Sequence, residues 1–285
     1  MRQDFAQILK DAKIDIRVEY QKLYGMLFDR SIDVLGGKRI SVYDELSDNF
    51  IGFYFRGTCL SIDEFDNMHG FHFEKEPVDF NIDKLILLCE YIENMLMGYQ
   101  STFSVSGYGY MAMTAQIPIN IQFYMMQIGQ VIEKIGYMRA NKDGLSIFVE
   151  KSSAAIAVAE IVPKELSYKV ISYNHYTMKG NLNAKKETLF AFANLLEPQR
   201  EKMSSIDNKF SSDLFYAFNN FNIRHNNISP ESPKYKKPIA DLTQEQLEYW
   251  YDEIYQMALL AFLKLEHAER KKAFDEIKHK IENKI

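Results

Sequence analysis

Residues 243–268 read TQEQLEYWYDEIYQMALLAFLKLEHA, and this stretch decides the fold class. Its apolar side chains recur every three or four positions, the spacing of one face of an α-helix: Leu247, Trp250, Ile254, Met257, Ala261, Leu265 and Ala268. Four more apolar residues lie on its other faces: Leu259, Leu260, Phe262 and Leu263. We therefore predict a long helix whose middle is buried all round and whose tail beyond Arg270 is more exposed. Thr243 and Gln246 have the spacing of a capping box at its start.

Further helices are predicted outward from this stretch. Apolar stripes indicate helices at residues 82–99, 118–135 and 183–196, another starting at Ser205 or Asp207, and one or two within residues 4–28. Asp143-Gly144, followed by alternating apolar residues up to Glu150, predicts a β-hairpin. Residues 50–60 fit either a strand or a buried irregular segment. The expected class is mainly α, with a C-terminal helical bundle and an α-rich N-terminal half that carries a small hairpin.

The character of the sequence changes after Gly180, so we expect two regions, residues 1–179 and 180–285. The C-terminal region holds the helices that start near 183 and 205 and the long closing helix. Between the last two lies an insert, residues 227–242, with three of the chain's seven prolines, which cannot be helical throughout.

Composition limits the possible functions. The chain has 285 residues, 47% hydrophobic and 26% charged, which is typical of a folded protein and excludes a disordered chain or a collagen-like repeat. A net charge of −5 disfavours a dedicated duplex-DNA binder. Two cysteines, Cys59 and Cys89, exclude a four-cysteine zinc site and a disulfide scaffold. Without a secretory or membrane-spanning pattern, we expect a cytoplasmic protein.

Established catalytic and cofactor motifs are missing from the sequence, so we expect no cofactor. His69 and His72 follow Cys59 closely enough for a metal to be considered. Their spacing fits no ordered ligand set, and an ordinary loop is the stronger interpretation, so no metal site is predicted.

Residues 218–227, FNNFNIRHNN, contain the densest group of side chains that could take part in catalysis or binding. Amide, guanidinium and imidazole groups crowd the end of an aromatic helix. In a structural interpretation, asparagines end the helix and fasten the insert, and cations suit the negative end of the helix dipole. In a functional interpretation, Arg224 binds a phosphate, His225 acts as acid or base, and Asn220 and Asn226 orient them. Such a set can cleave RNA without a metal, because the 2′-OH supplies the nucleophile.

With this cluster, residues 183–282 resemble the HEPN superfamily of helical-bundle proteins, many of which belong to prokaryotic abortive-infection and toxin systems. The resemblance rests on the all-helical layout, the Arg224, His225 and Asn cluster at a helix end, the insert and the long closing helix. It implies a metal-independent endoribonuclease or RNA-binding effector of an antiviral system, acting as a homodimer or with a partner protein. The superfamily's RNases separate Arg from His by four to six residues, whereas Arg224 and His225 are adjacent.

Other side chains complete the expected site. Asn227 would bind substrate, and His175 and Lys179, just before the expected boundary, would line a cleft. The aromatic patch Tyr249, Trp250, Tyr251 and Tyr255 fits core packing better than stacking on RNA bases. The alternative function is a non-catalytic sensor or assembly module that binds a protein partner through aromatic surfaces.

Overall fold

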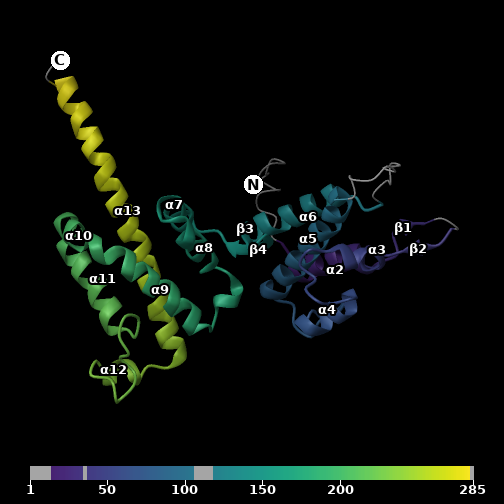
Figure 1. Cartoon of the computed structure of the whole chain (residues 1–285), viewed down its shortest axis with the longest axis horizontal. Helices are drawn as coiled ribbons and strands as arrows, with labels where there is room; N and C mark the ends of the chain where they lie inside the picture. The colour runs from purple at the N-terminus through teal and green to yellow at the C-terminus, as the bar shows by residue number, and fades with distance from the viewer. Residues whose placement is uncertain (1–13, 35–36, 106–117, 283–285) are drawn as a thin grey trace, which may run out of the picture. The chain divides into compact units, whose positions relative to one another are not determined.

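The computed structural model describes residues 14–34, 37–105 and 118–282, and these residues are mainly helical, as predicted. They form two compact units, residues 1–148 and 149–285 (Figure 1). The parts of the sequence expected to be helical before residue 14 lie outside the described residues. No helix among the described residues is long and apolar enough to cross a membrane.

The N-terminal unit is built around one long helix, α5. Its elements are α2 (Ile16–Phe28), β1 (Ile32–Asp33), β2 (Arg39–Ile40), α3 (Val42–Asn49), η1 (Phe50–Gly52), α4 (Ile62–His69), α5 (Ile82–Val105), α6 (Ile121–Lys134), β3 (Tyr137–Lys142) and β4 (Leu145–Glu150). α5 packs against α2, α3 and α6, because its middle is apolar on nearly every face. Residues 50–60 form a 3₁₀ turn and irregular backbone, as the second interpretation of this segment predicts, but only Phe50, Phe53 and Cys59 are buried.

Two small antiparallel sheets accompany these helices. β1 pairs with β2 in the register Ile32 to Ile40, and β3 pairs with β4 as the predicted hairpin. Asp143 and Gly144 both have positive φ angles at its turn, 52° and 85°, as a two-residue hairpin loop requires. Cys59 and Cys89 are buried and free, so they form no disulfide.

Side chains of α5 bind the backbone of β4. The Ser146 N–H donates to Asn94 Oδ1 (2.8 Å), and Asn94 Nδ2 donates to the Ser146 carbonyl (2.8 Å). One turn away, Glu90 Oε1 accepts from the Phe148 N–H (2.7 Å). The hairpin is therefore anchored to a helix by polar side chains, which satisfies a strand edge that would otherwise be left unpaired.

After the end of β4, every described regular element of the C-terminal unit is a helix. Its elements are α7 (Ser153–Ile161), α8 (Lys164–Ser172), η2 (Tyr176–Met178), α9 (Leu182–Leu196), η3 (Glu197–Gln199), α10 (Arg200–Ile206), α11 (Asn208–Asn220), α12 (Lys237–Ala240) and α13 (Gln244–Glu282). α13 packs against α7, α9, α10 and α11 (Figure 1). The predicted capping box is present, since Thr243 Oγ1 accepts from the Gln246 N–H and Gln246 Oε1 from the Thr243 N–H.

The division between the units lies before α7, earlier than the boundary at residues 179 and 180 expected from composition. α7 and α8 belong with the C-terminal helices because their apolar side chains enter the same core. Val158, Val170 and Tyr173 are buried in one cluster with Phe192 and Tyr255. Helices as short as α7 and α8 are stable only when they pack against other helices, and composition does not show which helices those are.

Candidate functional site

α11 ends in a loop held by two asparagines. Asn222 has a φ of 57°, a left-handed conformation that asparagine tolerates better than most residues. Its N–H donates to Asn227 Oδ1 (2.8 Å), and the Asn227 N–H returns a longer bond to Asn222 Oδ1 (3.4 Å). This reciprocal pair turns the chain out of the helix and into the insert.

Asn227 also fixes the far side of the insert. Its Nδ2 donates to the Lys234 carbonyl (2.8 Å), and its own carbonyl accepts from the Lys236 N–H (2.8 Å). The side chain is buried and both its polar atoms are hydrogen-bonded. Asn227 was expected to bind substrate, but its hydrogen bonds within the chain give it a structural role.

We expect Asn227→Ala to lower the free energy of unfolding of the C-terminal unit by about 2 kcal/mol, because the Asn222 N–H and the Lys234 carbonyl lose their buried partner. Urea unfolding followed by the fluorescence of Trp250, the only tryptophan, measures this. Asn226→Ala is the matched control and should cost less than about 1 kcal/mol, since Asn226 is exposed. Equal losses in the two variants would contradict the role assigned to Asn227.

The side chains of three of the four residues expected to be catalytic have partners within the chain. The Arg224 guanidinium pairs with the Glu197 carboxylate at the end of α9. Asn220 Nδ2 donates to the Tyr216 carbonyl of its own helix (2.8 Å), and Asn226 Oδ1 accepts from the Ser229 N–H (3.0 Å). His225 is exposed. An arginine paired with a carboxylate offers less charge to a phosphate, so this arrangement favours a structural role for Arg224.

His175 and Lys179 lie between α8 and α9. His175 caps η2, where its Nδ1 is 2.7 Å from Thr177 Oγ1, and its backbone bridges Val149. Neither residue lines the pocket at the end of α11, where the asparagine loop lies.

Next to the asparagine loop is a pocket of about 560 Å³, called here the polar pocket. It is lined by Leu182, Asn183, Lys186, Asn222, Asn226, Ile228, Ser229, Leu247 and Tyr251. Lys186 Nζ lies 3.3 Å from Asn222 Oδ1. Burial lowers the pKa of the Lys186 amine, and burial raises the pKa of Tyr251 to about 12, although a hydrogen bond from Asn222 acts to lower it. None of the lining residues is acidic, so the pocket suits an anion.

Lys186 is the cation of this pocket because its neighbour Lys185 is already neutralised. Lys185 is buried, and its Nζ contacts Glu248 (2.7 Å) and Asp252 (2.7 Å) of α13. No carboxylate in the described residues pairs with Lys186. The sequence contains a signal for Lys185 and Lys186, since two adjacent lysines near a helix N-terminus are unfavourable for the helix dipole.

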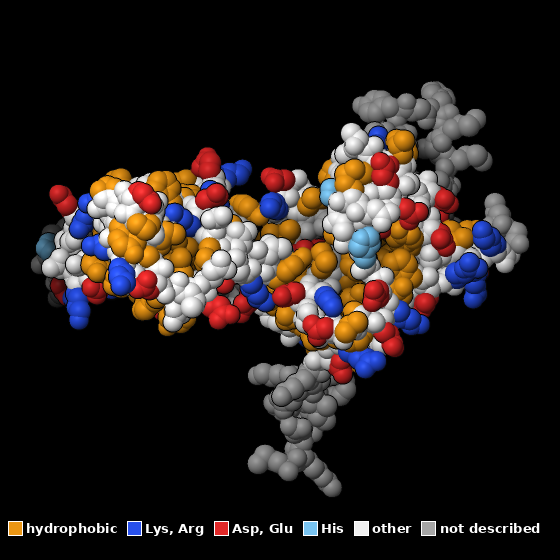
Figure 2. Space-filling model, turned by 90° about the horizontal axis from the view of Figure 1, so that it is seen from below, with side chains coloured by type: hydrophobic (Ala, Val, Ile, Leu, Met, Phe, Trp, Pro, Cys, Tyr) orange, Lys and Arg blue, Asp and Glu red, His pale blue; other side chains and the backbone are white. Residues whose placement is uncertain are grey.

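The insert adds positive charge beside the polar pocket. Lys234, Lys236 and Lys237 are exposed, and none forms an ion pair with another described residue. The hydrogen bonds of Asn227 hold this lysine segment next to Asn226, which lines the polar pocket. On the face visible in Figure 2, basic and acidic side chains are interspersed.

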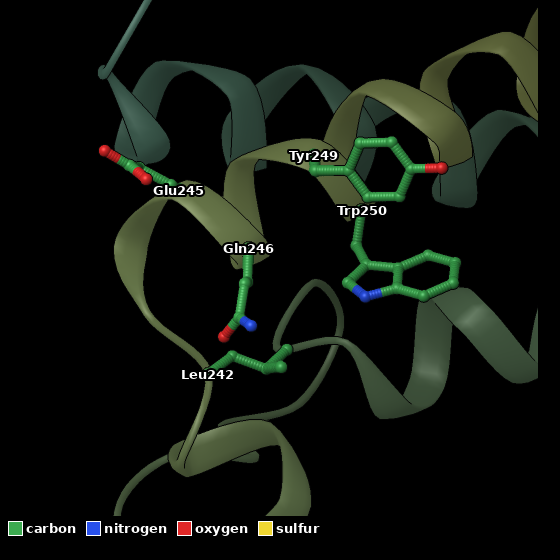
Figure 3. Close-up of a pocket in the computed structure, with 5 residues that line it drawn as sticks. All are labelled: Leu242, Glu245, Gln246, Tyr249 and Trp250. Carbon is green, nitrogen blue, oxygen red and sulfur yellow. The ribbon is translucent and has the colours of Figure 1, made fainter.

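A second, smaller pocket of about 240 Å³ opens at the start of α13 (Figure 3). This aromatic pocket is lined by Leu242, Glu245, Gln246, Tyr249 and Trp250. Tyr249 and Trp250 are 57% and 42% exposed, whereas Tyr251 and Tyr255 are buried, so core packing holds for only half of the predicted patch. Phe221 contacts Trp250, with ring centroids 5.3 Å apart. Phe221, the neighbour of Asn222 in sequence, therefore supports a side chain that lines the aromatic pocket.

The comparisons with known proteins add no relative. No protein-family model matches the sequence, and no curated protein or solved structure matches it significantly. The described residues contain no cluster of three His, Cys, Asp or Glu side chains that could hold a metal ion. The resemblance to the HEPN superfamily therefore stays a prediction.

Proposed function

We propose that the C-terminal unit binds single-stranded RNA, with a phosphate in the polar pocket. The observation that carries the proposal is the Lys186 amine, which has no carboxylate partner in the described chain and lies in a pocket lined by amide and hydroxyl groups. The three lysines of the insert supply the backbone charge that RNA binding requires. Such a protein would suit the antiviral or toxin effector implied by the HEPN resemblance, acting in the cytoplasm.

The side-chain contacts within the chain favour RNA binding over RNA cleavage. Metal-independent cleavage needs a cation at the phosphate and a base beside it, and no His, Asp or Glu side chain of the described residues lines the polar pocket around Lys186. Arg224 is paired with Glu197, and the Asn220 and Asn226 side chains are bonded to backbone groups. We therefore expect RNA to stay intact in the presence of a chelator. Cleavage by the wild type that is lost in His225→Ala would overturn this part of the proposal.

We expect Lys186→Ala to weaken the binding of a fluorescein-labelled single-stranded RNA of about 12 nucleotides roughly tenfold, the effect of losing one charge-assisted hydrogen bond. The slope of log K against log salt is negative, and its magnitude should decrease by about 0.7, because one fewer phosphate is neutralised. Fluorescence anisotropy at several salt concentrations measures both quantities.

Lys209→Ala is the matched control. Lys209 is exposed at the start of α11, a helix length away from the insert, and should leave affinity unchanged. The proposal fails if Lys186→Ala and Lys209→Ala have equal effects, or if the wild type does not bind RNA.

The exposed aromatic pocket favours a second candidate function, the binding of a protein partner. Glu245 on its rim is unfavourable for RNA, whereas Tyr249, Trp250 and Leu242 offer the apolar and aromatic surface of an interaction hot spot. RNA titrated into the protein separates the candidates. If bases stack here, Trp250 fluorescence is quenched and Trp250→Ala weakens RNA binding; if the pocket serves a protein partner, neither happens.

A further inference from the structure

The last turns of α13 extend beyond the helical bundle. Leu265 is the last buried residue of the helix, and every side chain from Glu269 to Glu282 is exposed. Figure 1 shows this end of α13, in yellow, continuing past α10. Lys202 of α10 pairs with Glu269, where the exposed segment of α13 begins.

This projecting segment carries large apolar side chains on one face. Phe274, Ile277 and Ile281 are 66%, 53% and 73% exposed. Their spacing of three and four residues places them in one row, as in the seam of a coiled coil. The row continues toward the bundle through Leu260, Leu263, His267 and Arg270; we call these seven residues the α13 stripe.

The charges beside the α13 stripe are mostly basic. At 100° per residue, Lys271 and Lys278 lie along one side of it and Lys280 along the other, and Arg270 lies within it. The acids Glu269, Asp275 and Glu276 are on the opposite half of the helix, and Glu282 pairs with Lys278 (3.7 Å). Glu266 borders the stripe, but it pairs with Arg270 (2.9 Å).

This pattern disfavours a second copy of the chain as the occupant. A parallel pairing of two α13 stripes would place Arg270 against Arg270 in the seam. An antiparallel pairing would bring together the two rows that contain Lys271 and Lys278. Like charges at these positions oppose association.

We propose that the α13 stripe docks an amphipathic helix of a partner protein, with apolar residues at heptad spacing and Asp or Glu along both flanks. Apolar seam residues of the partner would cover Phe274, Ile277 and Ile281. Its acidic flanks would face Lys271, Lys278 and Lys280, so that opposite charges select the partner and its register. This proposal is independent of RNA binding, since no residue of the α13 stripe lines the polar pocket.

Two designed helical peptides with the same Leu and Ile seam test the proposal, one with Glu and one with Lys at all flanking positions. Anisotropy with the full-length protein should show binding of the Glu peptide only. Phe274→Ser with Ile277→Ser should weaken it about 100-fold, roughly tenfold for each apolar side chain removed. Because both side chains are exposed, helix content and Trp250 fluorescence should stay unchanged.

Charge reversal and a control on the far face sharpen the test. Lys271→Glu with Lys278→Glu should shift the preference toward the Lys peptide, while Glu276→Ser should have no effect. The proposal is overturned if neither peptide binds or if both bind equally. It is also overturned if sedimentation shows self-association abolished by Phe274→Ser, if vesicles of anionic lipid bind the wild type but not that variant, or if RNA displaces the peptide.

Discussion

Replacing Arg139 with Ala is expected to lower the free energy of unfolding of the N-terminal unit by about 3 kcal/mol. The Arg139 guanidinium of β3 binds the Glu93 carboxylate of α5 with both nitrogens of its fork, Nε to Oε1 at 2.6 Å and Nη2 to Oε2 at 2.7 Å. The Glu93 side chain is 1% exposed, so without Arg139 its charge would stay buried and unpaired. Because the Arg139 side chain is 49% exposed, water can replace part of the contact, and we expect the low end of the usual range.

Hydrogen exchange of α5 peptides measures this loss, since the only tryptophan lies in the other unit. The double variant Arg139→Met with Glu93→Met should recover most of the stability, because no charge is then left buried. Arg17→Ala serves as control, since Arg17 forms an exposed pair with Glu76 (3.8 Å) and should change stability by less than about 0.5 kcal/mol. A loss as small as that of Arg17→Ala would show that Glu93 does not depend on its arginine.

The second large effect concerns Lys185, which links α9 to α13. Lys185→Ala is expected to cost about 3 kcal/mol, because a buried cation is removed together with its charge-assisted bonds to Glu248 and Asp252. Asp252 keeps a hydrogen bond from the Tyr173 hydroxyl (2.9 Å) and Glu248 keeps one from the Gly180 N–H (2.7 Å). Urea unfolding followed by Trp250 fluorescence reports on this unit directly.

Acid should reduce the effect of Lys185→Ala. Burial raises the pKa of Glu248, but hydrogen bonds from Lys185 and the Gly180 N–H outweigh it, so the pKa lies below its usual value. A carboxylate with a lowered pKa contributes stability above its unfolded pKa of about 4.3, and this contribution is lost as pH falls through the folded pKa. The difference in unfolding free energy between the wild type and Lys185→Ala should therefore shrink below about pH 4. A difference independent of pH would contradict the pairing.

Local signals predicted the elements of the fold well. The apolar stripe and capping box of residues 243–268 predicted α13, and Asp143-Gly144 predicted the hairpin, because both depend on side chains close in sequence. The exposed tail of α13 was also predicted. Trp250 and Leu260 were expected to be buried but are 42% and 45% exposed. A periodic pattern identifies the face of a helix but not how far the neighbouring helices extend over it.

The candidate site was harder to predict, because its groups come from separate elements. Lys186 of α9, Asn222 after α11 and Tyr251 of α13 meet only once the bundle has formed. The sequence identified the segment that forms the asparagine loop. It did not identify the residues that pair with this segment, such as Glu197 with Arg224. Which cation stays unpaired depends on residues distant in sequence, and neither composition nor spacing specifies these.

The bonds of Asn227 also matter for the entropy of the connection between α11 and α13. By joining the start of the insert to the Lys234 carbonyl and the Lys236 N–H, Asn227 divides one long loop into two shorter ones. The entropic cost of closing a loop rises only slowly with its length, so residues added between these bonds would cost little. The tip around Pro230 and Pro233 is therefore where this chain can best tolerate a change of length while α11 and α13 keep their places.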